Sequence, residues 1–181
     1  MARVHPTIDD ELAEWISRQH VFFVASAPSG DDGHVNLSPK GYDTFRVLGP
    51  TEVAYLDLTG SGVETIAHVR ENGRLTIMFC AFEGKPRILR LFGRAEAVAV
   101  GDPEFDGLAA AFPPVPGIRS VIRLQVERVQ SSCGWAVPHM AYERERETLD
   151  EWAARKGPDG IAEYHAEKNA RSIDGLPGVA P

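Results

Sequence analysis

Residues 51–100 read TEVAYLDLTGSGVETIAHVRENGRLTIMFCAFEGKPRILRLFGRAEAVAV, and this stretch decides the fold class. Its apolar residues change from an alternating period to a helical one and back again. Gly73 ends the helical part, and Gly93 predicts a bulge within the last strand. The predicted elements are a strand over Thr51–Leu58, a helix over Val63–Asn72, and strands over Arg74–Phe82 and Arg87–Val100.

Similar patterns continue on both sides of this stretch. Thr7 is expected to cap a first helix that fades near His20. Most of the predicted strands are joined by short turns, which favours antiparallel pairing. We therefore predict an α+β split barrel of about six mostly antiparallel strands with peripheral helices. The flanking elements are strands over Val21–Ala27, His34–Lys40 and Ile118–Val129, and helices over 102–111, 142–156 and 161–171.

Composition and charge exclude several classes of partner. The 181 residues carry a formal net charge of −7 with no basic block, which disfavours nucleic acid and anionic membrane surfaces. No apolar run approaches the roughly 20 residues that cross a bilayer, and no apolar signal core follows Met1, so a cytoplasmic location is expected. Cys80 and Cys133 are far apart and lack metal-ligand spacing, so we expect two reduced, buried thiols that act as small hydrophobic residues, and no metal site.

The segment Val35–Gly41, VNLSPKG, places polar side chains on one strand face. Asn36, Ser38 and Lys40 alternate there, and such a wall can hydrogen-bond an aromatic ring system rich in acceptors. A solvated strand face that ends in a turn is the alternative interpretation.

A glycine-rich turn joins the strand at Tyr55 to the following helix. Backbone N–H groups at a helix start bind anions, phosphate above all, and the hydroxyls of this turn would add donors. A simple cap with glycines for tight geometry is the alternative. The residues that would take part are Thr59, Gly60, Ser61, Gly62 and Thr65.

Arg90 interrupts an apolar strand. A buried guanidinium needs a partner, so Arg90 is expected to face an anion, a carboxylate or solvent. His68 lies on the short helix and is interpreted as a core or surface residue rather than a catalyst.

Together the segments VNLSPKG, VAYLDLTGSG, ENGRLTIMFCAF and RILRLFGRAEAV resemble the pyridoxamine 5'-phosphate oxidase-like family of FMN-binding split barrels. The resemblance spans roughly His20 to Val129. The length of the chain and its helical pattern predict one domain over 1–181, in which 141–181 is a helical C-terminal extension. The resemblance implies a homodimer with FMN bound at the subunit interface.

The resemblance further implies a set of cofactor-binding positions. Lys40 falls where the family has a basic residue near the flavin ring, and Asn36 and Ser38 share its strand. Tyr55 and Leu56 match positions on the next strand that line the cofactor. Arg90 or Ile88 matches a flavin-contacting strand position, and Trp135 looks like the aromatic residue beside the ring.

Three departures separate this chain from true oxidases of the family. Val35 stands where they carry an arginine, and Gly60-Ser61-Gly62 stands where they carry a Ser-Arg-Lys phosphate clamp. The C-terminal segment 172–181, SIDGLPGVAP, lacks their arginine-rich ending. Oxidation of pyridoxamine phosphate is therefore not expected.

The predicted function is an FMN-dependent oxidoreductase acting on a small molecule that the sequence does not identify. One alternative is a reductase that uses the deazaflavin F420, whose anionic tail could lie in a groove of Arg70, Arg74, Arg87 and Arg94. Another is a flavin- or haem-binding carrier or sensor without turnover, with His34 or His68 as a haem ligand.

Overall fold

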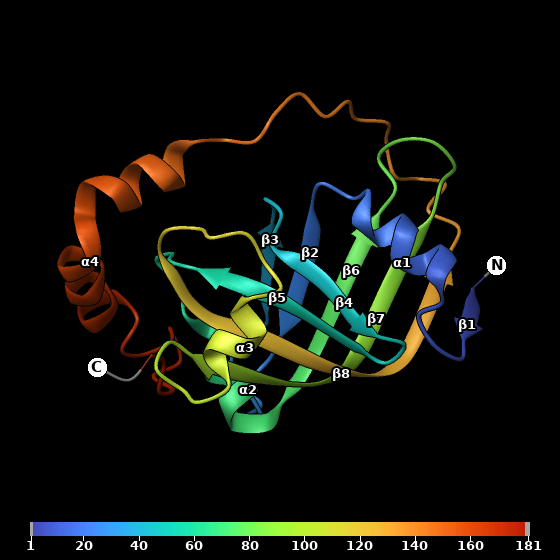
Figure 1. Ribbon diagram of the computed structural model, residues 1–181. Coiled ribbons are helices and arrows are strands. Elements are labelled where there is room, and N and C mark those ends of the chain that lie inside the picture. The colour runs from blue at the N-terminus through green and yellow to red at the C-terminus, as the bar shows by residue number, and fades with distance from the viewer. Residues whose placement is uncertain (1, 180–181) are drawn as a thin grey trace.

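The computed structural model describes residues 2–179, which form eight strands and four helices (Figure 1). The strands form one antiparallel sheet, and the helices lie outside it. The elements are β1 (Arg3–His5), α1 (Asp10–Ser17), β2 (Phe22–Ser26), β3 (Asn36–Lys40), β4 (Phe45–Gly49), β5 (Glu52–Leu58), α2 (Glu64–Asn72), β6 (Arg74–Cys80), β7 (Ile88–Ala99), α3 (Phe105–Ala109), β8 (Ile118–Ser132) and α4 (Thr148–Lys168).

The strand order is β3-β2-β6-β7-β8-β5-β4, and β1 adds to β8 off this path. Every pairing is antiparallel, and the sheet coils without closing. This architecture confirms the α+β class and the antiparallel sheet. The predicted strand count was too low, because β1 has only three residues and β4, FRVLG, carries Arg46 within a short apolar run.

The long strands β7 and β8 lie next to each other in the middle of the sheet. Their register shifts between Phe92 and Gly93, which confirms the predicted bulge. A Cβ atom at Gly93 would lie 2.0 Å from the carbonyl oxygen of Gln125, so only glycine lets the two strands approach here. The bulge bends β7 and helps the sheet to wrap around its core.

Two groups of buried side chains hold the fold together. The larger fills the barrel and includes Ile77, Leu91 and Leu124, all with no exposed surface. The smaller lies beneath α3 and contains Ala54, Leu56, Phe112 and Val121. The second group fixes the outer face of β5, whose far end contributes to the site described below.

The helix boundaries differ from the predicted ones in two places. Asp9, not Thr7, caps α1, because its carboxylate accepts a hydrogen bond from the Leu12 amide. The predicted helix over 142–156 begins only at Thr148, whereas the predicted break at Gly157-Pro158 is confirmed, because Gly157 is non-helical and kinks α4 there. In Figure 1 the preceding segment arches over the barrel as extended chain before it reaches α4.

The end of α2 agrees with its prediction, since Gly73 ends the helix with a φ of 71°. Of the two free cysteines, Cys80 is buried as predicted, whereas Cys133 is exposed. Among residues 2–179 no helix is both long and apolar enough to span a bilayer.

Candidate functional site

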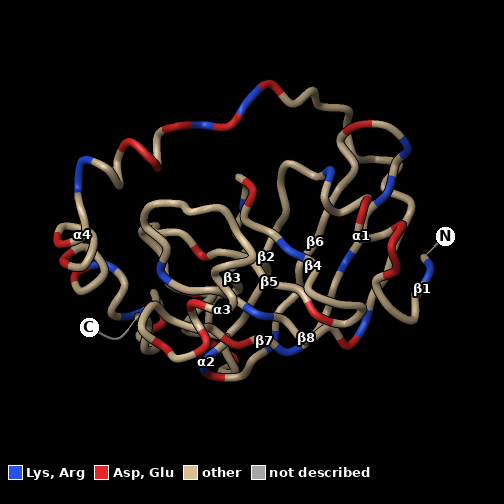
Figure 2. The backbone as a smooth tube through the Cα atoms, in the orientation of Figure 1, with Lys and Arg blue, Asp and Glu red and all other residues tan. Residues whose placement is uncertain are grey.

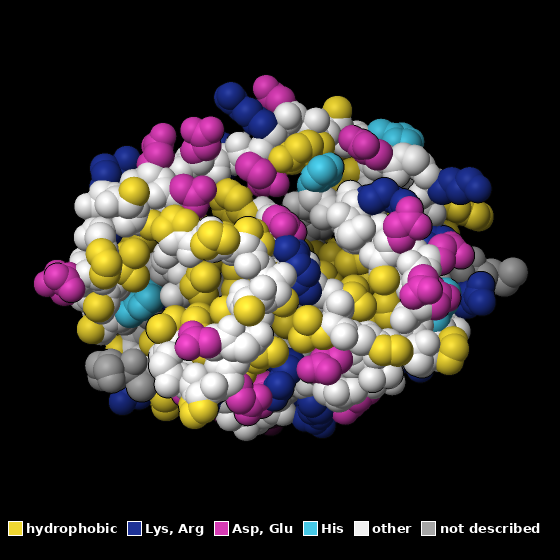
Figure 3. Space-filling model, viewed as in Figure 1, with side chains coloured by type: hydrophobic (Ala, Val, Ile, Leu, Met, Phe, Trp, Pro, Cys, Tyr) yellow, Lys and Arg dark blue, Asp and Glu magenta, His cyan; other side chains and the backbone are white. Residues whose placement is uncertain are grey.

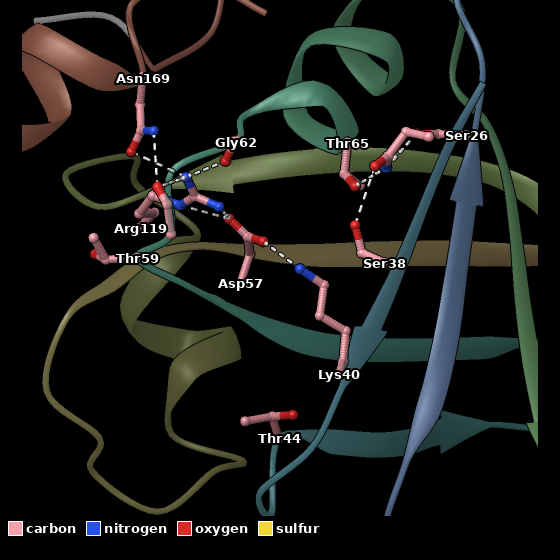
Figure 4. Close-up of polar contacts among 12 residues, drawn as sticks. Ser26, Ser38, Lys40, Thr44, Asp57, Thr59, Gly62, Thr65, Arg119 and Asn169 are labelled. Carbon is pink, nitrogen blue, oxygen red and sulfur yellow. Dashed lines mark hydrogen bonds and ion pairs between the residues drawn. The ribbon is translucent and has the colours of Figure 1, made fainter. Parts of the chain in front are cut away.

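A cavity of about 340 Å³ opens between β3, the end of β5 and the start of α2. Figure 4 shows the polar side chains that surround it. Arg119 of β8 and Leu149 of α4 complete its lining. Eight of the twelve predicted cofactor-binding residues line it: Asn36, Ser38, Lys40, Leu56, Thr59, Gly60, Gly62 and Thr65.

The other four predicted residues lie elsewhere. Ser61 is in the same turn with an exposed side chain, and Tyr55 is fully buried in the barrel core. Arg90 donates a hydrogen bond to Ser132 at 3.3 Å, and the Trp135 side chain is 81% exposed. Within a single chain, Arg90 and Trp135 do not join the cavity, and their proposed contact with a cofactor stays a prediction.

Hydrogen bonds order the polar face of β3. The Asn36 amide donates to Ser26 and Thr65 at 3.2 and 3.0 Å, and its carbonyl accepts from the Ser38 hydroxyl at 3.1 Å. Ser26 in turn lies 3.0 Å from Nδ1 of the buried His68. The Ser38 hydroxyl donates its hydrogen to Asn36, so the lone pairs of the Ser38 oxygen remain free to accept a hydrogen bond from a ligand.

Lys40 and Asp57 face each other across the cavity. The Lys40 Nζ lies 3.5 Å from Oδ1 of Asp57, and Oδ2 of Asp57 accepts from Arg119 at 2.9 Å. One carboxylate thus serves two cations, which leaves a net positive charge at the base of the site. Oδ1 of Asp57 is buried, and its nearest partner is the Lys40 ammonium, which lies between this oxygen and the cavity-lining residues of β3.

Side chains of Arg119 and Asn169 hold the glycine-rich turn in place by donating hydrogen bonds to its carbonyl groups. The guanidinium of Arg119 donates to the Gly62 carbonyl at 2.7 Å, and the Asn169 amide donates to the carbonyls of Gly60 and Ser61 at 3.0 and 3.5 Å. In a trans peptide the N–H points opposite to the C=O. The N–H groups of residues 61–63 therefore point away from Arg119 and Asn169.

These amides remain available for an anion. The N–H groups of residues 61–66 find no acceptor within the described chain, and the cap residue of α2, Val63, supplies none from its side chain. A helix start with free N–H groups attracts negative charge. Glu64 also lies in this first turn and offsets part of that attraction, although the Ile173 amide donates to its carboxylate at 3.3 Å.

Residues at the C-terminal end of α4 contact the glycine-rich turn and its neighbour Thr59. Nε2 of His165 lies 2.8 Å from the hydroxyl of Thr59, which itself donates to the Gly117 carbonyl at 2.7 Å. Burial, reinforced by the nearby Arg119, lowers the pKa of His165. Burial also lowers the pKa of His68. The lowered pKa values favour the neutral form of both imidazoles, and because Thr59 donates its proton to Gly117, Nε2 of His165 is the donor in its contact with Thr59.

Tyr55 lies behind the cavity. Its buried hydroxyl has no hydrogen-bond partner, and burial, with the nearby Asp57 carboxylate, raises its pKa well above the ordinary value. The phenol stays protonated and uncharged.

Asp57, Arg119, Asn169 and His165 were not predicted as site residues. A signal existed for two of them, since Asp57 and Arg119 each interrupt an apolar strand with a charge that burial makes costly. Asn169 and His165 gave no signal, because only the tertiary fold brings the end of α4 to the turn.

Comparisons with known proteins agree with this architecture. The family model described as pyridoxamine 5'-phosphate oxidase matches residues 8–133. A pyridoxamine 5'-phosphate oxidase family protein, UstO of Aspergillus flavus, is 40% identical, and the match covers 97% of this chain and 77% of UstO.

Solved structures share the fold at low sequence identity. The HupZ protein of Group A Streptococcus is 22% identical with a TM-score of 0.53, over 69% of this chain and 99% of HupZ. A Lactobacillus delbrueckii protein provisionally described as a pyridoxamine 5'-phosphate oxidase is 20% identical with a TM-score of 0.51, over 68% of this chain and 93% of its own. These likenesses confirm the split-barrel fold. From the family model and the fungal relative it follows that the chain belongs to the pyridoxamine 5'-phosphate oxidase family.

Proposed function

We propose that this protein binds FMN in the cavity between β3 and α2 and is a flavin-dependent oxidoreductase. One observation carries the proposal: the cavity combines free amides at a helix start with the Lys40 ammonium, which the buried Asp57 carboxylate holds in place. A ligand with an anionic group at one end and hydrogen-bond acceptors at the other satisfies both, and FMN has a phosphate and ring carbonyl groups. The flavin would supply hydride or electron transfer, and the protein would supply binding and orientation.

The polar residues suit the two ends of such a cofactor. The amides of residues 61–63 would hold the phosphate without the arginine and lysine of true oxidases, at a lower electrostatic gain. Ser38 and Lys40 would hydrogen-bond the polar edge of the ring, and Asn36, whose amide binds Ser26 and Thr65, would orient Ser38. Lys40 would also stabilise negative charge there, although Asp57 neutralises part of its own charge.

A homodimer is part of the proposal. β3 is an edge strand; its Leu37 is 64% exposed, and Val35, just before the strand, is 76% exposed. An exposed apolar edge favours contact with a second copy, which could bring Arg90 or Trp135 to the partner's cavity. Light scattering that returns the mass of a single chain would contradict this part of the proposal.

The geometry favours FMN over F420. Of the four arginines that could form a groove for the F420 tail, Arg74 and Arg94 lie opposite each other on β6 and β7, but their guanidinium groups are already bound by the chain. Arg70, Arg74 and Arg94 donate to the carbonyls of Gly178, Pro28 and Asn72, respectively. Arg87 lies over the Trp15 ring. It directly precedes β7, whereas Arg94 lies in the middle of that strand.

Haem ligation by the two candidate histidines is likewise not favoured. Nε2 of His68 is buried, and its Nδ1 is engaged by Ser26. His34 binds Asp174 through Nδ1 and does not line the cavity, so a ligand in the candidate site would not meet it. A flavin carrier without turnover remains the second candidate, because no side chain of the cavity is required as a nucleophile.

The test is an absorption spectrum of the purified protein before and after addition of FMN, with any retained ligand identified by mass. A flavin spectrum at close to one FMN per chain is expected, together with reduction by a nicotinamide donor. A bound flavin that neither nicotinamide reduces nor oxygen reoxidises would indicate a carrier. Binding of F420 or haem in preference to FMN would overturn the proposal.

A further inference from the structure

A second and larger cavity lies beside the first. It has a volume of about 1200 Å³ and is bounded by α1, the start of β2 and the segment Met140–Arg146, here called the strap. The strap is the chain that arches over the barrel in Figure 1. Residues Pro39–Tyr42 line both cavities, so a molecule in the second would lie next to Lys40 and any ligand of the first.

The wall of the second cavity is rich in aromatic side chains. Trp15, Phe23, Phe82 and Tyr142 all line it. Figure 3 shows hydrophobic side chains at the bottom of hollows on this face and charged ones at the rims. Such a surface suits a planar apolar body with a polar end.

Only a few contacts fasten the strap over this space. The Tyr142 ring stacks on His20 with centroids 3.7 Å apart, and the Met140 amide donates to the Phe82 carbonyl at 3.0 Å. The Tyr42 hydroxyl donates to the Arg146 carbonyl. These contacts hold the strap at Met140, Tyr142 and Arg146, and the strap thereby forms one wall of the cavity.

The charge of the lining is opposite to that of the whole chain. Six cations, Arg18, Lys40, Lys85, Arg87, Arg144 and Arg146, line the cavity against three acids, Glu11, Glu83 and Glu145, in a protein of net charge −7. Figure 2 shows basic and acidic residues interleaved along the strap. Within residues 2–179, Arg18 pairs with Glu14 and Arg87 with Glu11, while Lys85, Arg144 and Arg146 have no carboxylate within 4 Å.

We propose that this second cavity is the substrate chamber and takes a small aromatic or otherwise planar apolar molecule that carries an anionic group, such as a carboxylate. The proposal rests on the proposed function for its chemistry, since the chamber adjoins the cavity assigned to FMN. Aromatic side chains would hold the body of the substrate, and Lys85 and Arg144 would draw its charge. A concave wall built by one chain with an excess of positive charge favours such a ligand over the surface of a second copy of this acidic protein.

The test compares probes that differ only in charge. We would titrate 2-naphthoate, 2-naphthylmethanol and 2-naphthylmethylamine into the purified protein by calorimetry, with and without added FMN. The expected order of affinity is carboxylate, alcohol, amine, with the carboxylate at least about tenfold tighter than the amine and weakened by salt. An amine that binds as tightly as the carboxylate, or no binding of any probe, would overturn the proposal.

A double variant locates the binding. Lys85→Gln with Arg144→Gln is expected to weaken 2-naphthoate roughly tenfold and leave 2-naphthylmethanol unchanged. Arg155→Gln is the matched control, because Arg155 is an exposed arginine on α4 that pairs with Glu151 and lies outside the lining of this cavity. Equal effects of the double variant and the control would refute the assigned chamber.

The same experiments separate this inference from the proposed function. Naphthoate binding without any FMN binding would leave the chamber in place and refute the flavin assignment. FMN binding without charge-selective naphthoate binding would support the flavin assignment and refute the chamber. Light scattering that finds a dimer which excludes all probes would assign the groove to a second copy instead.

Discussion

Nε and Nη2 of Arg119 both lie 2.9 Å from Oδ2 of Asp57. The two side chains are 4% and 1% exposed, so the pair is buried between β5 and β8. Arg119 also binds the Gly62 carbonyl and the Asn169 side chain. A single guanidinium therefore links the base of the cavity, the glycine-rich turn and the C-terminal segment.

Replacing Arg119 with Met is expected to destabilise the fold strongly. The buried Asp57 carboxylate would keep only Lys40, at 3.5 Å, and broken buried pairs cost about 3–5 kcal/mol. Urea unfolding measures the loss. Arg155→Met, on an exposed arginine, is the control and should change the free energy of unfolding by less than about 1 kcal/mol. Similar losses in both variants would show that the buried pair has no special weight.

Replacing Asn169 with Leu is expected to weaken FMN more than riboflavin. Asn169 is fully buried and orients the Gly60 and Ser61 carbonyls, and thereby the amides assigned to the phosphate. Riboflavin lacks that phosphate, so it should be nearly insensitive, whereas FMN should lose roughly tenfold in affinity. Fluorescence titration measures both. An equal loss for the two flavins would place the effect of Asn169 outside the phosphate contact.

Stability is expected to fall as the pH drops below 6.5. The pKa values of His68 and His165 are lowered in the folded protein from the ordinary 6.5, mainly by burial. The unfolded chain therefore binds more protons in this range, and the histidine contribution is complete above pH 6.5 and lost as the pH falls through the lowered pKa values.

The melting temperature measured between pH 7.5 and 5.0 tests this linkage. His165→Gln should reduce the pH dependence while it preserves a hydrogen-bond donor for Thr59. A variant whose melting temperature follows pH with the same slope as the natural protein would refute the role of His165.

Replacing Gly93 with Ala is expected to destabilise the barrel by about 1–3 kcal/mol, because the new Cβ would meet the Gln125 carbonyl. Gly107 in α3 is the matched control, since a Cβ there has nothing within 4 Å and alanine favours a helix. Thermal unfolding of the two variants gives the comparison. A Gly93→Ala protein as stable as Gly107→Ala would mean that β7 and β8 shift apart without cost.

The sequence predicted most of the sheet because alternation and turn residues are local signals. Gly93 and Gly73 marked a bulge and a helix end for reasons that act within a few residues. Polar residues at alternate positions of β3 likewise led to one wall of the cavity. The short strand β1 escaped prediction, because three residues carry too little pattern and its pairing with β8 is wholly non-local.

The parts of the site that were missed depend on distant contacts. Asn169 and His165 reach the turn at Thr59–Gly62 from more than 100 residues away, and nothing in their own neighbourhood marks them. Arg119 and Asp57 could have been paired as opposite charges within two apolar strands. Their register, Asp57 opposite Ser120, is what brings them together, and it appears only once the sheet is formed.

The most direct test of the account is a titration of the flavin-free protein with FMN, run beside the Lys40→Met and Lys168→Met variants. Lys40 lines the cavity, and Lys168 is an exposed lysine that pairs with its neighbour Glu167. The account predicts one FMN per chain for the natural protein and for Lys168→Met, and an affinity roughly tenfold lower for Lys40→Met. Absence of FMN binding in the folded natural protein, or equal affinity in all three proteins, would contradict it.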